Sequence, residues 1–302
     1  MQGYGHAAYA ASLSEFGKPR QLQRSKGWLL ERPILGFEGK DAMGCYPLFV
    51  CGDWSQLDSD LEDIEDELLC ISLVTDPFGE YDLTSLRECF PDVTMPFKEH
   101  FVVDLSRALG TIVHSHHRRN ARRALSGLQV EKCASPIDFL DDWIALYGEL
   151  IERHNITGLA AFSKASFAKQ LVVPGMVAFR AVCGDATVGM VLWYEQDNRA
   201  YYHLGAYSAR GYELLASFAL FEYSIKYFAQ RHFEWLSLGS AAGVGNSGTS
   251  GLSRFKEGWS TGVRTAYFCG RIFDHKKYEE ILKTRHLLPL EYFPAYRVGE
   301  FR

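Results

Sequence analysis

The sequence predicts a mixed α/β fold built on a sheet, and three observations lead to this prediction. Apolar runs alternate with turn signals in the second half, and Gly184-Asp185 and Asp197-Asn198 are good hairpin turns between such runs. The stretch 211–231 leaves almost no polar face, so we expect a central buried helix there. A last apolar run follows a glycine-rich loop. The strands expected in this half are 176–183, 188–195, 200–206, 233–238 and 264–273.

Two regions flank these elements. Before the first strand we expect a strongly basic helix at 113–125 and a second helix at 136–154; a closing helix is expected at 274–286. The first half reads as mixed α and β, with an acidic helix at 57–69 and a buried strand at 68–74. No group of residues in the first half indicates a catalytic or binding site.

The composition allows a large core and two domains, because the chain has 302 residues of which 47% are hydrophobic. The formal net charge of -5 argues against general coating of nucleic acid, and no DNA partner is expected. A local basic groove remains compatible with that charge, since the segment 114–123 carries four arginines and three histidines.

The seven cysteines are scattered, odd in number and never in C-x-x-C spacing, which predicts reduced thiols in a cytoplasmic protein. His114, His116 and His117 lack a carboxylate or cysteine at ligand spacing, so no metal is expected. No stretch approaches the roughly 20 apolar residues that a membrane span needs.

The segment 251–259 carries the strongest chemical signal. It reads Gly-Leu-Ser-Arg-Phe-Lys-Glu-Gly-Trp and follows the glycine-rich loop directly. A cation fixed there in an apolar groove could face the negative charge that develops when an acyl group is transferred to an amine. The alternative for Lys256 is a surface lysine beside a buried aromatic.

A group of short runs in the second half forms one pattern, which comprises 202–206, 216–217, 238–239 and 251–258, together with Gly211. These runs resemble the FemAB-like and BioF2-like branch of the GNAT acyltransferase superfamily, and the resemblance covers about residues 110–285. The basic run 117–124 resembles the segment that opens the second domain in that branch. The resemblance implies two tandem GNAT-like domains, of which 1–108 would be degenerate and 109–302 catalytic.

The same resemblance implies roles around the Phe-Lys pair. Lys256 would stabilise the oxyanion intermediate, and Phe255, with Arg254 beside it, would shape the donor site.

The turn from Ser208 to Gly211 is a second candidate donor site, because a helix N-terminus binds phosphate readily. GNAT enzymes that use acyl-CoA carry a Q/R-x-x-G-x-G/A signature there, of which this chain keeps only the middle glycine. We expect acyl-CoA as the co-substrate, although most of the signature that binds its pyrophosphate is missing from this chain. The alternative is a serine N-cap with nothing bound.

A base is needed to take the proton from an attacking ammonium group. His203 stands on the strand that leads into the central helix, where GNAT enzymes often place such a group, and is our predicted base. Glu195, Glu213 and His154 are possible substitutes. The alternative for His203 is a buried histidine satisfied by the protein.

The basic helix offers a site for the acceptor or for a phosphate, because guanidinium groups bind phosphate through paired hydrogen bonds. A solvated helix face that balances the acidic first half is the alternative. The residues expected in this site are Arg118, Arg119, Arg122 and His154.

The stretch 243–248 matches G-x-G-x-x-G after a strand, but a dinucleotide fold would need a long helix and a parallel strand next. The chain gives Trp259, Gly262 and one last strand instead. A loop that closes over substrate is the preferred interpretation.

The leading functional hypothesis is an N-acyltransferase that moves an acyl group from acyl-CoA or another activated carrier to an amine on a small molecule, glycan or peptide. One alternative is a FemAB-like ligase that takes its aminoacyl group from aminoacyl-tRNA and extends a peptidoglycan-type precursor. A second alternative is an inactive GNAT scaffold that binds a partner or a phosphorylated glycan.

Overall fold

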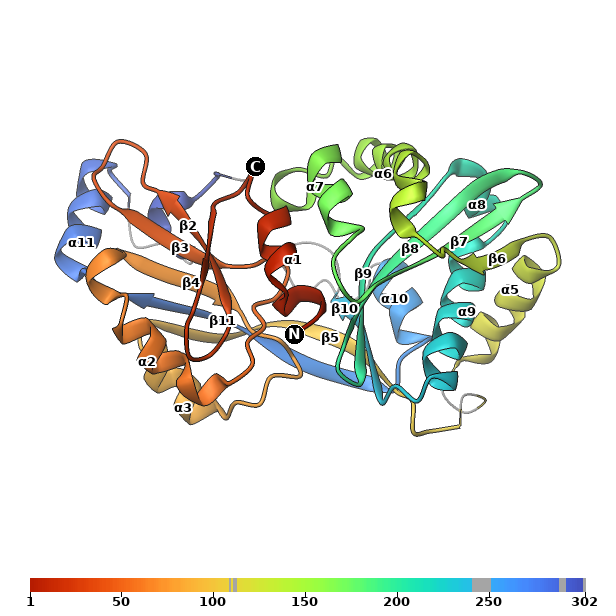
Figure 1. The fold of residues 1–302 in the computed structure, drawn as a ribbon, viewed down its shortest axis with the longest axis horizontal. Coiled ribbons are helices and arrows are strands. Elements are labelled where there is room, and N and C mark those ends of the chain that lie inside the picture. Colours follow the sequence, from red (N-terminus) through yellow and green to blue (C-terminus); the bar gives the residue numbers. More distant parts are fainter. Residues whose placement is uncertain (109, 111–112, 241–250, 288–291, 301–302) are drawn as a thin grey trace.

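A computed structural model describes residues 1–108, 110, 113–240, 251–287 and 292–300. Within these residues the strands form one mixed sheet that runs through the whole elongated molecule (Figure 1). In spatial order the strands are β1 (Lys18–Gln21), β2 (Trp28–Pro33), β3 (Lys40–Gly44), β4 (Cys70–Val74), β11 (Gly262–Ile272), β5 (Val93–Asp104), β10 (Trp235–Ser240), β9 (Arg199–Tyr207), β8 (Ala186–Gln196), β7 (Met176–Cys183) and β6 (Gln129–Lys132).

Helices cover both faces of the sheet. In the second half, α5 (Ser115–Leu125) and α9 (Ala216–Gln230) pack together on one face, whereas α6 (Leu140–His154) and α7 (Lys164–Gln170) lie on the other. The remaining helices are α1 (Ala7–Ser12), α2 (Leu57–Glu62), α3 (Leu83–Cys89), α8 (Ala209–Glu213), α10 (Gly251–Glu257) and α11 (His275–Thr284), with short 3₁₀ turns at Gly3–Gly5, Trp54–Gln56, Glu65–Glu67, Pro136–Phe139, Gly158–Ala160 and Ala295–Arg297.

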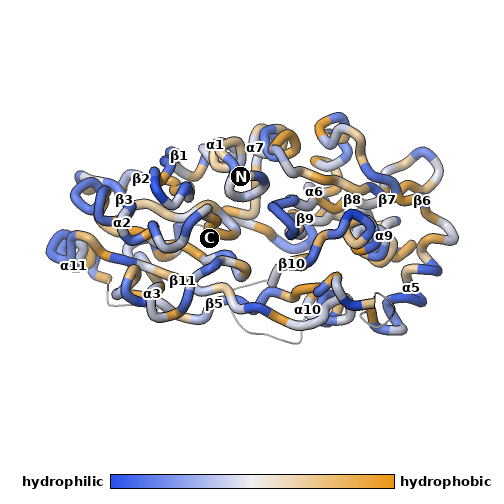
Figure 2. The backbone as a smooth tube through the Cα atoms, turned by 60° about the horizontal axis from the view of Figure 1, so that its bottom comes forward, coloured by the Kyte–Doolittle hydropathy of each residue, from blue (hydrophilic) through white to orange (hydrophobic). Residues whose placement is uncertain are grey.

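Hydropathy follows this layering. The surface helices α5 and α11 are largely hydrophilic along the backbone (Figure 2). The helix α9 instead buries Leu220, Phe221, Ile225 and Phe228 against the sheet. Each such side chain contributes roughly 1.5–3 kcal/mol by leaving water. None of the helices in the described part of the chain is long and apolar enough to cross a bilayer.

The predicted α/β class is confirmed, and each strand expected in the second half is present within two residues of its predicted ends. Two expectations were wrong in detail. The single helix expected at 211–231 is divided into α8 and α9, because Leu215 adopts a left-handed conformation with φ of 59° between them. The acidic helix expected at 57–69 ends at Glu62, and a 3₁₀ turn replaces its last part.

The two halves exchange their chain ends. Strand β11, from the end of the chain, inserts between β4 and β5, so that Cys269 pairs with Leu73 and Thr94. Conversely, the N-terminal segment docks on the second half, where the Gly3 N–H donates to the carbonyl oxygen of Pro174 at 2.9 Å. The division into tandem units near residue 108 stays a prediction. In the structure, the C-terminal strand β11 belongs to the sheet of the first half, and the N-terminal segment packs on the second half.

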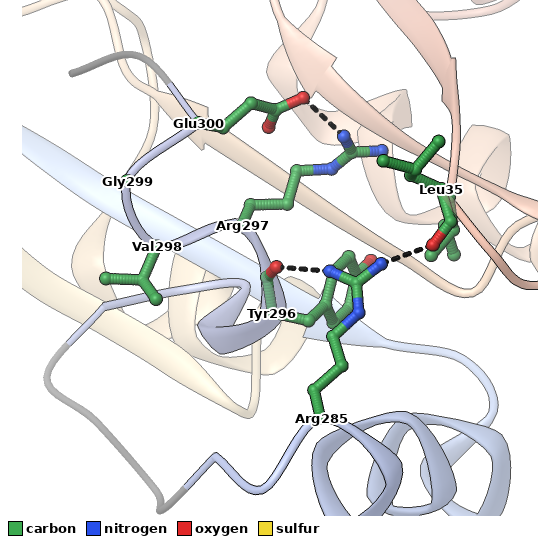
Figure 3. A pocket seen from close by; sticks show the side chains of 8 residues that line it. Leu35, Arg285, Tyr296, Arg297, Val298, Gly299 and Glu300 are labelled. Carbon is green, nitrogen blue, oxygen red and sulfur yellow. Dashed lines mark hydrogen bonds and ion pairs between the residues drawn. The ribbon is translucent and has the colours of Figure 1, made fainter.

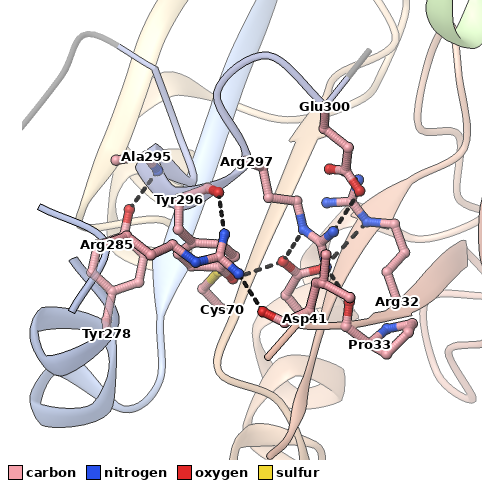
Figure 4. Close-up of polar contacts among 11 residues, drawn as sticks. Arg32, Pro33, Asp41, Cys70, Tyr278, Arg285, Ala295, Tyr296, Arg297 and Glu300 are labelled. Atoms are coloured by element: carbon pink, nitrogen blue, oxygen red, sulfur yellow. Dashed lines mark hydrogen bonds and ion pairs between the residues drawn. The ribbon is translucent and has the colours of Figure 1, made fainter. Parts of the chain in front are cut away.

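The C-terminal segment is fastened to the first half by a buried ion cluster centred on Asp41, which is fully buried (Figure 4). Its carboxylate accepts hydrogen bonds from Arg297 Nε at 2.6 Å, from the Tyr296 hydroxyl at 2.7 Å and from Arg32 Nε at 3.3 Å. Glu300 also pairs with both arginines. Because buried charges are costly unless they are paired, this cluster depends on every partner.

A cavity of about 310 Å³ lies beside this cluster (Figure 3). Arg285 spans it by donating to the carbonyl oxygens of Tyr296 and Leu35. Lys256 is not among the lining residues, which are Ile34, Leu35, Arg285, Tyr296, Arg297, Val298, Gly299 and Glu300. The cavity is therefore separate from the predicted chemistry.

Replacing Asp41 by Asn should lower the free energy of unfolding by about 3–5 kcal/mol, because it leaves two buried arginines short of a counter-charge. Urea unfolding of both proteins would measure the difference. The matched control is Asp63→Asn, since Asp63 forms an exposed pair with Arg24 and such pairs contribute about 0–1 kcal/mol. Equal losses of stability in the two variants would contradict the role of Asp41 as the centre of a buried ion cluster.

Candidate active site

Lys256 lies buried on α10, next to the end of β10. Its Nζ donates a hydrogen bond to the carbonyl oxygen of Ser240 at 2.6 Å, and the centre of the Tyr202 ring lies 5.6 Å from the same nitrogen. Burial lowers the pKa of Lys256 from its ordinary 10.5 to about 7. The cation singled out in the sequence is thus held inside the protein rather than in bulk solvent.

The sheet opens beside this amine. Strand β10 pairs with β9 in parallel only as far as Ser237 and Tyr201, although β9 continues to Tyr207. The pairing of β10 with β5 also shifts register between Ser237 and Ser240. From Tyr202 onward, the β9 edge facing β10 has no strand partner among the described residues.

Gly239 is required at this opening. Its φ is +75°, a conformation that side-chain-bearing residues rarely adopt, and an added Cβ would lie 3.2 Å from Lys256 Nζ. The glycine therefore lets the amine approach the backbone of β10.

An apolar floor positions α10. The ring of Phe255 packs edge-on against Phe221 and Phe218, with centroids 4.8 and 5.0 Å apart. His117 of α5 donates from Nε2 to the Phe255 carbonyl oxygen at 3.0 Å, which ties the basic helix to α10. The role of Phe255 in donor binding stays a prediction, as does that of Arg254, which is exposed on the same helix.

The turn from Ser208 to Gly211 is a self-contained helix cap. Ser208 Oγ accepts the Gly211 N–H at 3.1 Å, and the Ala209 N–H donates to the Glu149 carboxylate at 3.2 Å. Gly211 is needed because an added Cβ would lie 2.0 Å from the Val188 carbonyl oxygen. An acidic side chain therefore stands where the sequence suggested a phosphate, and the glycine serves packing against β8.

His203 is buried on the face of the sheet opposite α9. Its Nδ1 lies 3.1 Å from the Tyr4 hydroxyl and its Nε2 lies 3.0 Å from Gln170 Oε1, so both ring nitrogens have protein partners. Burial lowers the pKa of His203 to about 3. A histidine in this setting is a weak base, and the structure favours the alternative of a satisfied core histidine.

The residues predicted to bind the acceptor or a phosphate are not brought together. Arg119 and Arg122 are exposed on α5, and Arg118 is half-buried there. Among the described residues none of these three forms an ion pair with a carboxylate, so they present free positive charge. His154 ends α6, which packs on the other face of the sheet.

His100 of β5 is a buried group that the sequence did not single out. Its Nδ1 lies 3.3 Å from Ser237 Oγ, next to the opening. Burial, together with the charges of Lys256 and Lys98, lowers its pKa to about 3, so its imidazole is neutral. No local motif marks His100, because only the long-range pairing of β5 with β10 brings it to this place.

The G-x-G-x-x-G match at 243–248 lies outside the described residues. Over the ranges that the structure describes, no group of three or more His, Cys, Asp or Glu side chains is placed to hold a metal ion.

One known family model matches the part of the chain that holds the candidate site. Residues 114–257, which include α5, β7–β10 and the Phe-Lys pair, match the family model of the acetyltransferase (GNAT) domain. Over these residues the chain is similar to GNAT acetyltransferases, which supports an acyltransferase. A search of curated proteins gave no match.

Solved structures of GNAT-like fold extend the similarity over nearly the whole chain. FemX superimposes with a TM-score of 0.68 at 13% identity, covering 91% of this chain and 93% of FemX. The C-terminal domain of a predicted lysylphosphatidylglycerol synthetase from Agrobacterium fabrum gives 0.64 at 14% identity, covering 95% and 92%. L-PGS from Bacillus licheniformis gives 0.59 at 14% identity, covering 93% and 96%. At such identities the likeness shows the fold.

Replacing Lys256 by Met should stabilise the folded protein at neutral and lower pH. The folded pKa lies below the unfolded value, so stability in the natural protein rises with pH from about 7 to 10.5 as the buried amine loses its proton. Each tenfold change in proton affinity corresponds to about 1.4 kcal/mol, so the gain below pH 7 reaches several kcal/mol.

Urea unfolding at about pH 6 and about pH 9 would measure this gain, which should shrink at the higher pH. Lys276→Met, an exposed lysine on α11, is the control and should change stability little at either pH. A Lys256→Met protein with the same pH slope as the natural protein would show that this amine is not the titrating group.

Proposed function

We propose that this protein is an N-acyltransferase that moves an acyl group from an activated carrier to an amine at the opening between β9 and β10. The observation that carries the proposal is the buried Lys256 ammonium, held against the Ser240 carbonyl beside an unpaired strand edge. A fixed cation in a desolvated place is what a developing oxyanion requires.

The chemistry follows from this arrangement. The neutral acceptor amine attacks the carbonyl carbon, a C–N bond forms and the carbonyl oxygen becomes an oxyanion. Lys256 stabilises that oxygen by charge. The bond from carbon to the carrier's sulfur or oxygen then breaks, the carrier leaves and the amine loses a proton to solvent or to a base.

Two carriers fit different features of the site. An acyl-CoA has an extended arm with amide groups, which could add to the free edge of β9 as a strand does. Its pyrophosphate, however, would meet the Glu149 carboxylate at the start of α8. An aminoacyl-tRNA needs no phosphate at that position, and the exposed arginines of α5 offer a surface for its backbone.

The compartment and the family branch also belong to this proposal. All seven cysteines are free, which fits a reducing cytoplasm. The similarity to FemX over nearly the full length supports placing the chain in the FemAB-like and BioF2-like branch.

Thermal unfolding with each carrier should identify the donor, because a ligand that binds the folded state raises the melting temperature as its concentration exceeds its dissociation constant. We expect charged tRNA to stabilise the protein more than acetyl-CoA does, because of the Glu149 carboxylate. Uncharged tRNA and coenzyme A are the controls. Stabilisation by acetyl-CoA alone would reverse the assignment of the donor.

Replacing Lys256 by Ala should lower the transfer rate by about a hundredfold or more, which is the usual cost of losing one oxyanion donor. Since only the protonated amine stabilises an oxyanion, the rate attributable to Lys256 should fall as pH rises through about 7. A pH profile of kcat for the natural protein and the variant tests both points. A full transfer rate in the variant, or a ratio of natural to variant rate that does not fall through this pH, would remove the oxyanion role.

A further inference from the structure

Helix α10, which carries Lys256, is too short to keep its place alone. It has seven residues, and isolated helices of fewer than about 12 residues are marginal in water. Its position therefore depends on contacts with the rest of the protein. On one side, the rings of Phe255 and Trp259 pack against aromatic side chains of α9. That contact buries one face of α10 but leaves the carbonyl groups at its end in need of donors.

Two hydrogen bonds from the start of α5 meet this need, one on each side of Lys256. The backbone N–H of His114 donates to the carbonyl oxygen of Gly258 at 3.0 Å. The side chain of His117 donates from Nε2 to the carbonyl oxygen of Phe255, also at 3.0 Å. The backbone that carries the amine is therefore held to α5 at both of its neighbouring turns.

The ring of His117 fills the space between the two helices. It is 7% exposed, and its centroid lies 5.1 Å from that of Phe218 and 5.2 Å from that of Trp259. Gly258 lies directly against it, because an added Cβ there would lie 2.2 Å from the ring Cε1 and 2.4 Å from Nε2. The ring thus sets the distance between α5 and the end of α10.

The donor in this link is uncharged. Since Nε2 donates to a carbonyl oxygen, the neutral ring of His117 carries its proton there, and Nδ1 is the bare nitrogen. Nδ1 is buried without a hydrogen-bond partner among the described residues, so a charged ring would carry an N–H with no acceptor. Burial lowers the pKa of His117; the bond to the Phe255 carbonyl raises it, and the charges of His116 and His114 lower it again.

We propose that His117 is a positioning residue, which holds the backbone beside Lys256 so that the amine stays buried against the Ser240 carbonyl oxygen. This inference rests on the proposed part of Lys256 in acyl transfer and explains how that amine is placed. Without the link, α10 would move and the amine would gain contact with water. It would then hold its proton more tightly, because burial is what disfavours its charged form.

A titration of the amine by NMR tests the placement directly. The protein is prepared with isotope-labelled lysine, and the Cε signal that is missing in Lys256→Met is followed with pH. The midpoint in the natural protein should lie near 7. The titratable groups that face the amine are His100, whose pKa is lowered to about 3, and Tyr202, whose pKa burial raises, so neither changes its charge near that midpoint.

Two variants disturb the link from opposite sides. His117→Phe keeps a ring but removes the N–H, and Gly258→Ala displaces the ring. In both we expect the midpoint to rise, by about tenfold or more in proton affinity. His117→Gln keeps a donor and should stay close to the natural midpoint. The controls are His116→Phe, exposed on the same helix, and Gly127→Ala, where an added Cβ meets open space; both should leave the midpoint unchanged.

Transfer kinetics provide a second readout, with acetyl-CoA and with charged tRNA as donors. His117→Phe should lower kcat by about 10- to 100-fold, since a displacement of about 1 Å costs that much. KM should change little, because Lys256 acts on the transition state. His117→Gln should recover most of the rate.

The outcomes separate this inference from the proposed function. An unchanged midpoint in folded His117→Phe overturns the positioning role, and so does a raised midpoint with an unchanged kcat; both leave acyl transfer standing. A raised midpoint in a protein that transfers from neither donor supports the placement of the amine by His117 and overturns the proposed reaction. Circular dichroism checks the fold of each variant. If His117→Phe does not fold, a natural midpoint in Gly258→Ala overturns the positioning role.

Discussion

The site depends on keeping one ammonium group out of water. A buried lysine is costly unless its surroundings supply hydrogen bonds, and here the cost is met by the Ser240 carbonyl and the face of the Tyr202 ring. That carbonyl lies where β10 has left its pairing with β9 and has shifted register against β5, next to Gly239. The opening of the sheet and the placement of the charge are therefore one structural feature, and a fully paired β10 would leave Lys256 without its hydrogen-bond acceptor.

The parts of the fold that follow local patterns could be predicted from the sequence. Alternating apolar runs and hairpin turns located the strands of the second half, and the Phe-Lys pair located the buried cation. His100 could not be found in this way, because only the pairing of β5 with β10 brings it next to Ser237 and the opening. His203 shows the converse difficulty, since the sequence gives no sign that Tyr4, 199 residues away, occupies its ring nitrogen.

The two faces of the sheet carry different buried groups beside the opening. Lys256 reaches it from the helical layer of α5, α9 and α10, whereas His100 of β5 lies on the layer of α6 and α7. The two groups therefore stand on opposite faces of the same strands.

The exchange of chain ends constrains how the polypeptide is assembled during synthesis. When the ribosome has produced only the first hundred residues, the place between β4 and β5 is still vacant, and it is filled only when β11 emerges near residue 270. Until then the nascent first half exposes two unfinished strand edges, which invite aggregation. Gene fusions or circular permutations that separate residues 262–272 from the rest would consequently deprive both halves of their common central strand.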